Sequence, residues 1–543
     1  MNPLIQRLLG ERGVTDVDAF LNPQYDTRRD PFLLRDMDIA VARILKAIKK
    51  KEKIAVWHDY DCDGIPGGSL LSDFFMKIEY PARLMVAERN EGYGLNEAGI
   101  RLLADEGVSV LITVDCGITD NVCVALAQSL GIDVIVTDHH LPQNELPPAI
   151  AVINPHRTDD TYPEKVLCGT GVAFKLVEAL IANGDFNLPE GWQKWLLDLV
   201  ALATVADMVP LTGENRTLVK FGLDVMRKGR RKGLVALLKK ERVPFKDVVE
   251  DDIAFSIAPK INAASRMESP RLAVELLTTT DAARADELAN KLIALNKARK
   301  LEGARVAKDV KHRLSGMQMG DIIVMGSSEW RPSLLGIAGN NIVETYGKTV
   351  CLWGKDGDLI KGSIRGNGRV NVVALMTGAR RAFTDFGGHE SSGGFSTTTE
   401  LIHSLPLALE EALRTSATLV VEESTKVHDG VLTLAEASQT TYDALRLMAP
   451  FGMQNPKPIF RFVNVRVDRV LLFGKAKEHA RLALSDESGA YGEAMSFFFH
   501  RTPFRATIDL LSSGDIVTLA AALDRSFFGG RPSLRLRIEN LSI

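Results

Sequence analysis

The sequence lacks the features of a membrane protein or of a disulfide-bonded secreted protein. It has five cysteines and no CxxC spacing, so reduced thiols in a cytoplasmic protein are the simplest interpretation. No apolar run reaches the about 18–20 residues of a membrane span. The longest candidate, residues 196–211, is interrupted by Asp198 and Asp207. Residues 1–13 are polar and charged, so we expect no secretory leader and no membrane contact.

The chain also lacks a large excess of charge of either sign. Its formal net charge of −3 excludes a nucleic-acid binder that relies wholly on positive charge, although net charge hides local patches. One such patch, residues 227–242, holds eight basic residues and one acid, and it indicates either a nucleic-acid contact or a solvated helix face. The length of 543 residues and the apolar content of 45% predict a globular protein of several domains.

Carboxylates gather directly after a short apolar run. Asp59, Asp61 and Asp63 alternate along the chain, and residues two apart point the same way on an extended strand. Like charges held together repel, and a divalent cation would neutralise them. A solvated acidic turn is the alternative interpretation of this motif taken alone.

Three later segments repeat this design. Apolar runs lead to Asp115, to Asp138 with His139 and His140, and to Asp207. Helical patterns lie between the strands, at residues 65–78, 96–106 and 119–130. This alternation predicts a mostly parallel, doubly wound sheet, whose ligands bind beyond the carboxyl ends of the strands. Carboxylates and histidines without a cysteine pair favour two Mn²⁺ or Mg²⁺ ions about 3.5–4 Å apart, an arrangement suited to phosphoryl hydrolysis.

The motifs at these positions resemble those of a known family. DYDCDG (59–64), TVDCG (113–117), TDHH (137–140) and ATVADMVPL (203–211) are similar to the four motifs of the DHH phosphoesterase superfamily. The resemblance is closest to its RecJ family of single-strand-specific 5′→3′ exonucleases. Further matching segments are RNEGYGL (89–95), PKINAASRM (259–267), EWRPSLLGIAG (329–339), GSIRG (362–366), FGGHESSGG (386–394) and APFGMQNPKPIF (449–460).

The resemblance implies a role for each matching residue. The ligands of two metals would be Asp61, Asp63, Asp115, His139 and Asp207, with Asp115 bridging and Asp59 as a further ligand or an outer carboxylate. Asp138 would orient the histidines, and His140 would contact the scissile phosphate. The 5′-terminal phosphate would be held by Arg89, Arg266, Ser363 and Arg365, opposite Gly387, Gly388 and His389. Guanidinium groups independently suit this task, because they bind phosphate oxygens in pairs.

This sequence departs from the family pattern in a few places. Ser265 stands where glycine is usual, Arg331 stands where histidine is usual, and Cys62 replaces an alanine. Gly393 and its neighbours differ from the usual alanines. None of these departures removes an implied ligand, and Arg331 bears on the substrate contacts of its loop.

We expect five parts in the chain. They are a helical lead-in (1–50), an α/β DHH domain (51–212), a helical region with a long connecting helix (213–314), a smaller α/β DHHA1 domain (315–420) and an all-β, OB-like barrel (421–543). In the last part Val463, Val465 and Val467 alternate with polar residues, which predicts one inward row. Its aromatic residues that could stack bases are Phe497, Phe498, Phe499, Phe527 and Phe528.

The resulting functional hypothesis is a metal-dependent exonuclease that degrades single-stranded DNA from its 5′ end in recombination and repair. We expect a cytoplasmic monomer whose partners are single-stranded DNA, a single-strand-binding protein and a helicase. Two alternatives stay open: a DHH phosphodiesterase for short oligonucleotides or cyclic dinucleotides, and an inactive scaffold of a replication complex. The barrel pattern disfavours the first, and the intact set of implied ligands disfavours the second.

Overall fold

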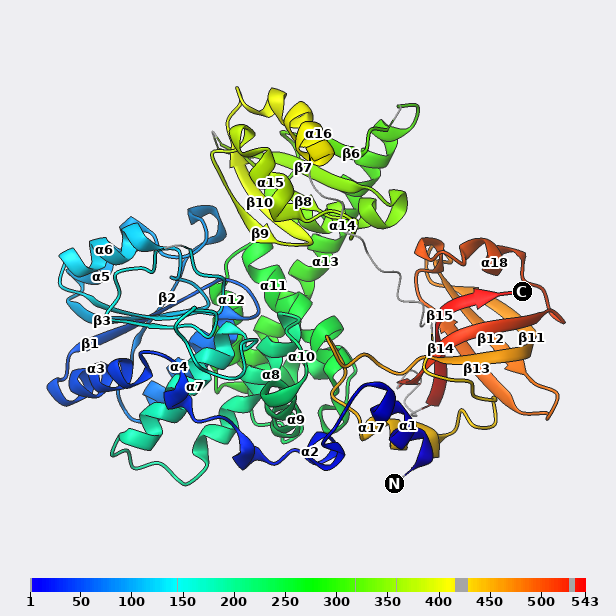
Figure 1. The fold of residues 1–543 in the computed structure, drawn as a ribbon, viewed down its shortest axis with the longest axis horizontal. Coiled ribbons are helices and arrows are strands. Elements are labelled where there is room, and N and C mark those ends of the chain that lie inside the picture. The colour runs from blue at the N-terminus through cyan, green and yellow to red at the C-terminus, as the bar shows by residue number, and fades with distance from the viewer. Residues whose placement is uncertain (1, 144, 318, 358, 416–427, 527–532) are drawn as a thin grey trace.

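The computed structural model describes residues 2–143, 145–317, 319–357, 359–415, 428–526 and 533–543. Two α/β units and a β-barrel surround a central helical region (Figure 1). This arrangement confirms the predicted fold class. Among the described residues, no helix is both long enough and apolar enough to cross a membrane.

The first unit is a parallel sheet with helices on both faces. Its strands lie in the order β2 (Arg83–Val86), β1 (Lys53–His58), β3 (Val108–Val114), β4 (Asp133–Thr137) and β5 (Ala151–Ile153). One face packs on α3 (Met37–Lys50), α4 (Gly64–Lys77) and α7 (Gly169–Asn183), and the other on α5 (Glu97–Asp105) and α6 (Asn121–Ser129). The central strands are buried on both faces, as their continuous apolar runs predict. The predicted helices end within two residues of the observed ones.

A helical region connects the two α/β units. It contains α8 (Leu197–Ala206), α9 (Gly213–Met226), α10 (Lys232–Lys240), α11 (Ala258–Met267), α12 (Arg271–Thr278) and α13 (Ala282–Leu314), with a π-helical turn at Asp252–Ile257. The long helix α13 is capped by Asp281 and runs up to the second unit (Figure 1).

Part of the basic segment 227–242 is engaged within the protein. Arg231 forms ion pairs with Asp73 (2.9 Å) and Asp198 (2.7 Å), and Lys240 pairs with Asp286 (2.7 Å). Arg227 donates to the carbonyl oxygen of Val248. These contacts give Arg227, Arg231 and Lys240 a structural role, whereas the other five basic residues of the segment are exposed.

The second α/β unit has a mixed sheet. Its strands lie in the order β6 (Ile322–Ser327), β7 (Thr349–Asp356), β8 (Leu359–Arg365), β10 (Ser392–Thr397) and β9 (Asp385–His389). The helices are α14 (Leu335–Tyr346), α15 (Val372–Gly378) and α16 (Leu405–Thr415). Helix α14 packs with the end of α13 on one face, and α15 and α16 form a core on the other.

The C-terminal unit is a closed barrel. Its strands lie in the order β11 (Phe460–Phe473), β12 (His479–Ser485), β13 (Tyr491–Ser496), β15 (Ser533–Ser542) and β14 (Ile516–Ser526), with α17 (Gln439–Arg446) before them and α18 (Arg505–Leu510) between β13 and β14. One sequence prediction is wrong here. Val463 is 42% exposed, because a bulge between Phe462 and Val465 shifts the register and turns Val463 outward.

The barrel core includes the start of the chain. Helix α1 (Pro3–Glu11) places Ile5, Leu8 and Leu9 in the same buried cluster as Phe460 and Phe462 of β11. The short helix α2 (Val17–Leu21) then leads back to the first α/β unit (Figure 1). The first two helices therefore pack with the far end of the sequence, and the boundaries expected at residues 50, 212, 314 and 420 stay predictions.

Candidate metal centre

Adjacent strand ends bring the predicted residues together. Strands β1, β3 and β4 are neighbours, and their pairing continues past their ends: Asp59 N–H donates to Val114 O (3.2 Å) and Asp115 N–H to Thr137 O (3.0 Å). The residues that follow each strand therefore stand side by side at one edge of the sheet. Helix α8 delivers Asp207 to the same place. We call this set the carboxylate–histidine cluster: Asp59, Asp61, Asp63, Asp115, His139, His140 and Asp207.

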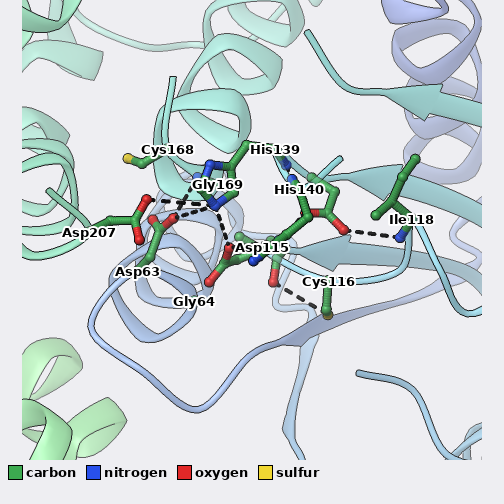
Figure 2. Close-up of polar contacts among 12 residues, drawn as sticks. Asp63, Gly64, Asp115, Cys116, Ile118, His139, His140, Cys168, Gly169 and Asp207 are labelled. Carbon is green, nitrogen blue, oxygen red and sulfur yellow. Dashed lines mark hydrogen bonds and ion pairs between the residues drawn. The ribbon is translucent and has the colours of Figure 1, made fainter. Parts of the chain in front are cut away.

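The cluster contains three overlapping groups whose ligand atoms all lie within 4.8 Å of one another. His139 is at the centre of Figure 2, with its Nε2 atom 3.6 Å from Asp63, 3.2 Å from Asp115 and 3.7 Å from Asp207. The three groups are Asp63–His139–Asp207, Asp115–His139–His140 and Asp59–Asp61–Asp115. Because Asp115 and His139 each belong to two groups, the geometry suits adjacent cations that share ligands.

Backbone N–H donors and glycine residues determine how closely the carboxylates of the cluster approach one another. Asp63 accepts hydrogen bonds from the N–H groups of Gly169 (2.6 Å) and Thr170 (2.8 Å) at the start of α7. A Cβ atom on Gly169 would lie 2.6 Å from the Cβ atom of Asp115, so only glycine permits this approach. Asp61 accepts from the N–H groups of Asp63 (2.7 Å) and Gly64 (3.2 Å). Gly64 and Gly169 thus help to hold the carboxylates at short range.

The buried negative charges of the cluster would be stabilised by a bound cation. Burial, followed by repulsion from Asp63, Asp61 and other carboxylates, raises the pKa of Asp115 well above its usual value. The same causes raise the pKa of Asp207 to about 8. Among the described residues, no hydrogen-bond partner reaches the buried Oδ1 atoms of Asp59 and Asp115. Asp115 also adopts a left-handed φ of 60°, a strained conformation that functional sites often contain. These oxygen and imidazole donors fit Mn²⁺ or Mg²⁺.

Asp138 orients the second histidine. Its Oδ1 atom accepts hydrogen bonds from the N–H of His139 (2.7 Å) and from Nδ1 of His140 (2.8 Å), and its Oδ2 accepts from the N–H of Ile118 (3.0 Å). Burial alone would lower the pKa of His140, but the hydrogen bond and charge of Asp138 outweigh it and raise that pKa to about 9. Asp138 therefore lies where the sequence places it, behind the histidines.

Tyr93 is a member of the site that the sequence analysis did not single out. Its hydroxyl donates to the carbonyl oxygen of Asp115 (2.7 Å) and lies 3.2 Å from Nδ1 of His140. It thereby holds the strained backbone of Asp115 and the ring of His140 together. A signal was present, because Tyr93 is the aromatic residue of the RNEGYGL segment.

The predicted phosphate ligands Arg89, Arg266 and Arg365 lie in a second cluster of like charge. Arg299, which was not predicted, completes this cluster. Burial and the charges of the other three arginines lower the pKa of Arg266 to about 9. Arg365 donates to Ser363 Oγ (2.7 Å), and Arg89 lies over the ring of Tyr60 at 4.7 Å. Among the described residues, none of these arginines forms an ion pair within 4.0 Å. We call this set the arginine cluster; its geometry suits an anion.

Arg299 was missed because it comes from the middle of α13, where no motif marks it. Its Nε atom and that of Arg266 are buried without a hydrogen-bond partner among the described residues. Arg331, the departure from the family pattern, lines a surface cavity of about 490 Å³ together with Met267, the neighbour of Arg266. This departure therefore lies beside the arginine cluster.

The glycine-rich strand β9 faces the histidines. The rings of His140 and His389 stack with centroids 6.1 Å apart, so the second α/β unit reaches the metal centre through β9. Gly387 and Gly388 precede His389 and are exposed. Strand β10, the partner of β9, accepts a hydrogen bond from Ser363 Oγ at Gly393 O (3.2 Å). Strand β9 therefore contacts the carboxylate–histidine cluster through His389, and its partner β10 contacts Ser363.

The barrel offers two of the predicted aromatic residues to solvent. Phe497 and Phe498 are 40% and 47% exposed, whereas Phe499 is fully buried in the core. Arg535 lies over the ring of Phe497 and Arg501 over that of Phe498, each at 5.1 Å. Phe527 and Phe528 lie outside the described residues.

The parallel sheet with carboxylates and histidines at its carboxyl edge defines a DHH-type phosphoesterase fold. In agreement, residues 53–204 match the family model described as "DHH family, N-terminal domain" and residues 428–540 match "RecJ OB domain". Proteins named "Single-stranded-DNA-specific exonuclease RecJ" are similar along most of this chain. The relative from Dickeya dadantii is 31% identical, with 99% of this chain and 96% of the relative covered. The relative from Bacillus subtilis is 33% identical, with 90% of this chain and 62% of the relative covered. The chain belongs to the RecJ family.

Solved structures support this assignment. The crystal structure of RecJ from Thermus thermophilus in complex with Mn²⁺ superposes with a TM-score of 0.80 at 26% identity, and covers 100% of this chain and 76% of that one. The Mg²⁺ complex of the same protein gives a TM-score of 0.74 at 25% identity, with 100% and 74% covered.

Proposed function

We propose that this protein is a Mn²⁺- or Mg²⁺-dependent exonuclease that degrades single-stranded DNA in the 5′→3′ direction, in DNA recombination and repair. The observation that carries the proposal is the sharing of Asp115 and His139 between groups of ligand atoms within 4.8 Å. Membership of the RecJ family supports the substrate, and the family's structures with Mn²⁺ and Mg²⁺ support the cofactor.

In this proposal Asp61, Asp63, Asp115, His139 and Asp207 hold two cations, and Asp59 is a further ligand or an outer carboxylate. When bound, such a pair supplies Lewis-acid stabilisation of the negative charge that develops on a phosphoryl group. His140 contacts the scissile phosphate, because Asp138 and Tyr93 fix its ring toward the side that His389 faces. The carboxylates exclude anions from the centre unless cations are present, so substrate and metal bind together.

The arginine cluster accounts for the direction of cleavage. Arg89, Arg266, Ser363 and Arg365, with Gly387, Gly388 and His389 opposite, hold a 5′-terminal phosphate. The positive charge of Arg89 stabilises the charged form of Asp59, and the negative charge of Asp61 stabilises the charged form of Arg266. The two clusters therefore lie near each other. A terminal phosphate fixed in the arginine cluster places the adjacent part of the strand at the metal centre. The short separation of the two clusters therefore favours removal of nucleotides from the 5′ end over cleavage inside the strand.

The barrel holds the rest of the strand. Phe497 and Phe498 are exposed next to arginines, a combination that suits stacking on bases of single-stranded DNA. We further propose a cytoplasmic monomer that works with a single-strand-binding protein and a helicase. The free cysteines support a reducing compartment.

The direct test is a nuclease assay on a strand labelled at either end. With Mn²⁺ present, a 5′-phosphorylated single strand is expected to be shortened from its 5′ end, and EDTA is expected to stop the reaction. A duplex with blunt ends and a cyclic dinucleotide serve as comparison substrates. Cleavage of the cyclic dinucleotide in preference to the long strand would favour the short-substrate alternative instead.

A further inference from the structure

The metal ligand Asp207 stands at the start of a short loop between α8 and α9. At one end its N–H donates to Ala203 O (2.9 Å), which continues the helix, and the next residue, Met208, takes a left-handed φ of 59°. Near the other end, Asn215 of α9 donates to Pro210 O (3.1 Å). The loop between these anchors determines where the Asp207 carboxylate points.

A turn from the C-terminal part of the chain docks on this loop. Leu211 N–H donates to Met453 O at 2.9 Å. The Leu211 side chain is buried, and a Cβ atom added at Gly452 would lie 2.7 Å from Leu211 Cδ1. The absence of a side chain at residue 452 therefore permits this close approach, and an added Cβ atom would displace the Leu211 side chain. We call residues 452–455 the docked turn.

The docked turn is internally rigid. Gly452 N–H donates to Asn455 O (2.9 Å), and Asn455 N–H donates back to Gly452 O (3.1 Å). The buried Asn455 side chain donates to Met448 O (2.9 Å) and Pro450 O (2.7 Å), and it accepts from Arg12 (2.6 Å). Every polar atom of this side chain is thus engaged, which keeps the turn in one conformation.

Arg216 of α9 fastens the same segment to the helical region. It is 2% exposed, and it donates to the carbonyl oxygens of Met448 (2.9 Å), Ala449 (2.8 Å) and Phe20 (3.0 Å). Undocking of the segment would strip a buried guanidinium of most of these acceptors, which is costly. The docked arrangement is therefore strongly preferred.

The segment is continuous with the barrel on both sides. Helix α17 precedes it and β11 follows it, and both ends are tied to the helical region (Figure 1). Arg446 forms an ion pair with the buried Glu250 (3.0 Å), and Lys457 pairs with Asp251. The loop that carries Asp207 is thus connected rigidly to the unit proposed to hold DNA.

We propose that the docked turn positions Asp207, with Gly452 and Leu211 as positioning residues, so that attachment of the barrel sets the affinity for one of the two cations. This inference rests on the proposed metal-dependent function. The mechanism is steric: a side chain at residue 452 presses on the buried Leu211 side chain, and the hydrogen bond from Leu211 N–H to Met453 O couples the turn to the loop that carries Asp207. The cation of the Asp59–Asp61–Asp115 group is not affected.

The test combines Gly452→Ala, Leu211→Ala and the double variant with calorimetric Mn²⁺ titration and Mn²⁺-dependent cleavage of a dinucleotide, which needs no barrel. We expect Gly452→Ala to weaken one of two Mn²⁺ sites about tenfold, the size typical of residues that support metal ligands. Saturating Mn²⁺ restores its turnover. Leu211→Ala shifts the affinity in the same direction, and the double variant recovers, because the smaller residue 211 makes room for the new methyl group. The loss of Mn²⁺ affinity in Asp207→Asn, which alters the ligand itself, is the reference against which the other variants are compared.

Gly10→Ala is the matched control, because Gly10 is exposed in α1 on the barrel side and an added Cβ there has no atom within 4 Å. Unchanged Mn²⁺ affinity in Gly452→Ala and Leu211→Ala, with weaker binding of a long strand only, would overturn the inference. If Gly452→Ala does not fold, Leu211→Ala alone decides, since it loosens the contact without adding an atom. Absence of Mn²⁺ binding by the wild-type protein would instead contradict the proposed function.

Discussion

The carboxylate–histidine cluster and the arginine cluster are two sites of like charge that are incomplete without opposite partners. In the first, burial and mutual repulsion raise the pKa of Asp115, and in the second they lower the pKa of Arg266. Both contain buried polar atoms without partners among the described residues, such as Asp59 Oδ1 and Arg266 Nε. The protein therefore holds a cation site and an anion site next to each other. Metal ions would neutralise the first, and the terminal phosphate of a DNA strand would neutralise the second.

The largest expected effect comes from removal of the shared carboxylate. Asp115→Ala should lower the cleavage rate at least about a thousandfold, because it takes a ligand from two groups at once. The rate on a 5′-phosphorylated single strand in Mn²⁺ measures this loss. Asp105→Ala, an exposed aspartate at the end of α5, is the control and should cleave normally. Near-wild-type turnover of a folded Asp115→Ala protein would show that the centre is wrongly assigned.

Loss of one arginine should affect selectivity more than chemistry. Arg365→Ala should reduce the preference for a 5′-phosphate over a 5′-hydroxyl about 10- to 100-fold, the size of a hydrogen bond to a charged group. Arg365→Lys should recover only part of it, because lysine lacks the paired donors. The ratio of kcat/KM values for the two strand ends is the measurement, with the exposed Arg369→Ala as control. An unchanged ratio would place the terminal phosphate elsewhere.

The barrel should contribute affinity alone. The double substitution Phe497→Ala and Phe498→Ala should weaken binding of a long single strand about thirtyfold, given about 1 kcal/mol, the lower end of the usual range, for each of two stacked bases. Cleavage of a dinucleotide should be unchanged, since the short substrate does not reach the barrel. Tyr491→Ala, a 78% exposed aromatic residue of the same barrel, is the control. Equal losses on both substrates would mean that these residues support the fold.

The smallest expected effect concerns the contact between the two α/β units. His389→Ala removes the ring stacked on His140 and should lower kcat by about two- to tenfold, the usual energy of an aromatic pair. Single-turnover cleavage at saturating Mn²⁺ measures it. Because His389 is also proposed to face the 5′-terminal phosphate, the preference for a 5′-phosphate should fall as well. An unchanged kcat and an unchanged preference would show that His389 acts at neither site.

Whole removal of the barrel is a poor test of its role. Ile5, Leu8 and Leu9 of α1 pack in the barrel core, and Arg216 is buried against the segment that precedes β11. A chain cut near residue 420 would expose these groups, so its loss of activity could not be assigned to DNA binding. Point substitutions on the barrel surface avoid this difficulty.

The sequence predicted the parts of the site that depend on local pattern. Asp59, Asp115 and His139 each follow an apolar run, and the parallel arrangement alone requires that such residues meet at one edge. Arg299 and the contact between Leu211 and the docked turn could not be found in this way, because such contacts join distant segments and leave no periodic signal. Val463 was wrongly placed because a bulge changes the alternation of a strand without changing its composition.

The central claim is that Asp115 joins two cation sites into one centre. The most direct measurement is the number of Mn²⁺ ions bound per chain, by equilibrium dialysis with metal analysis, for the wild-type protein and for Asp115→Ala. The account predicts two ions for the wild type and loss of both from the variant, with the fold retained by circular dichroism. A wild-type protein that binds fewer than two ions, or a variant that keeps both, would contradict it.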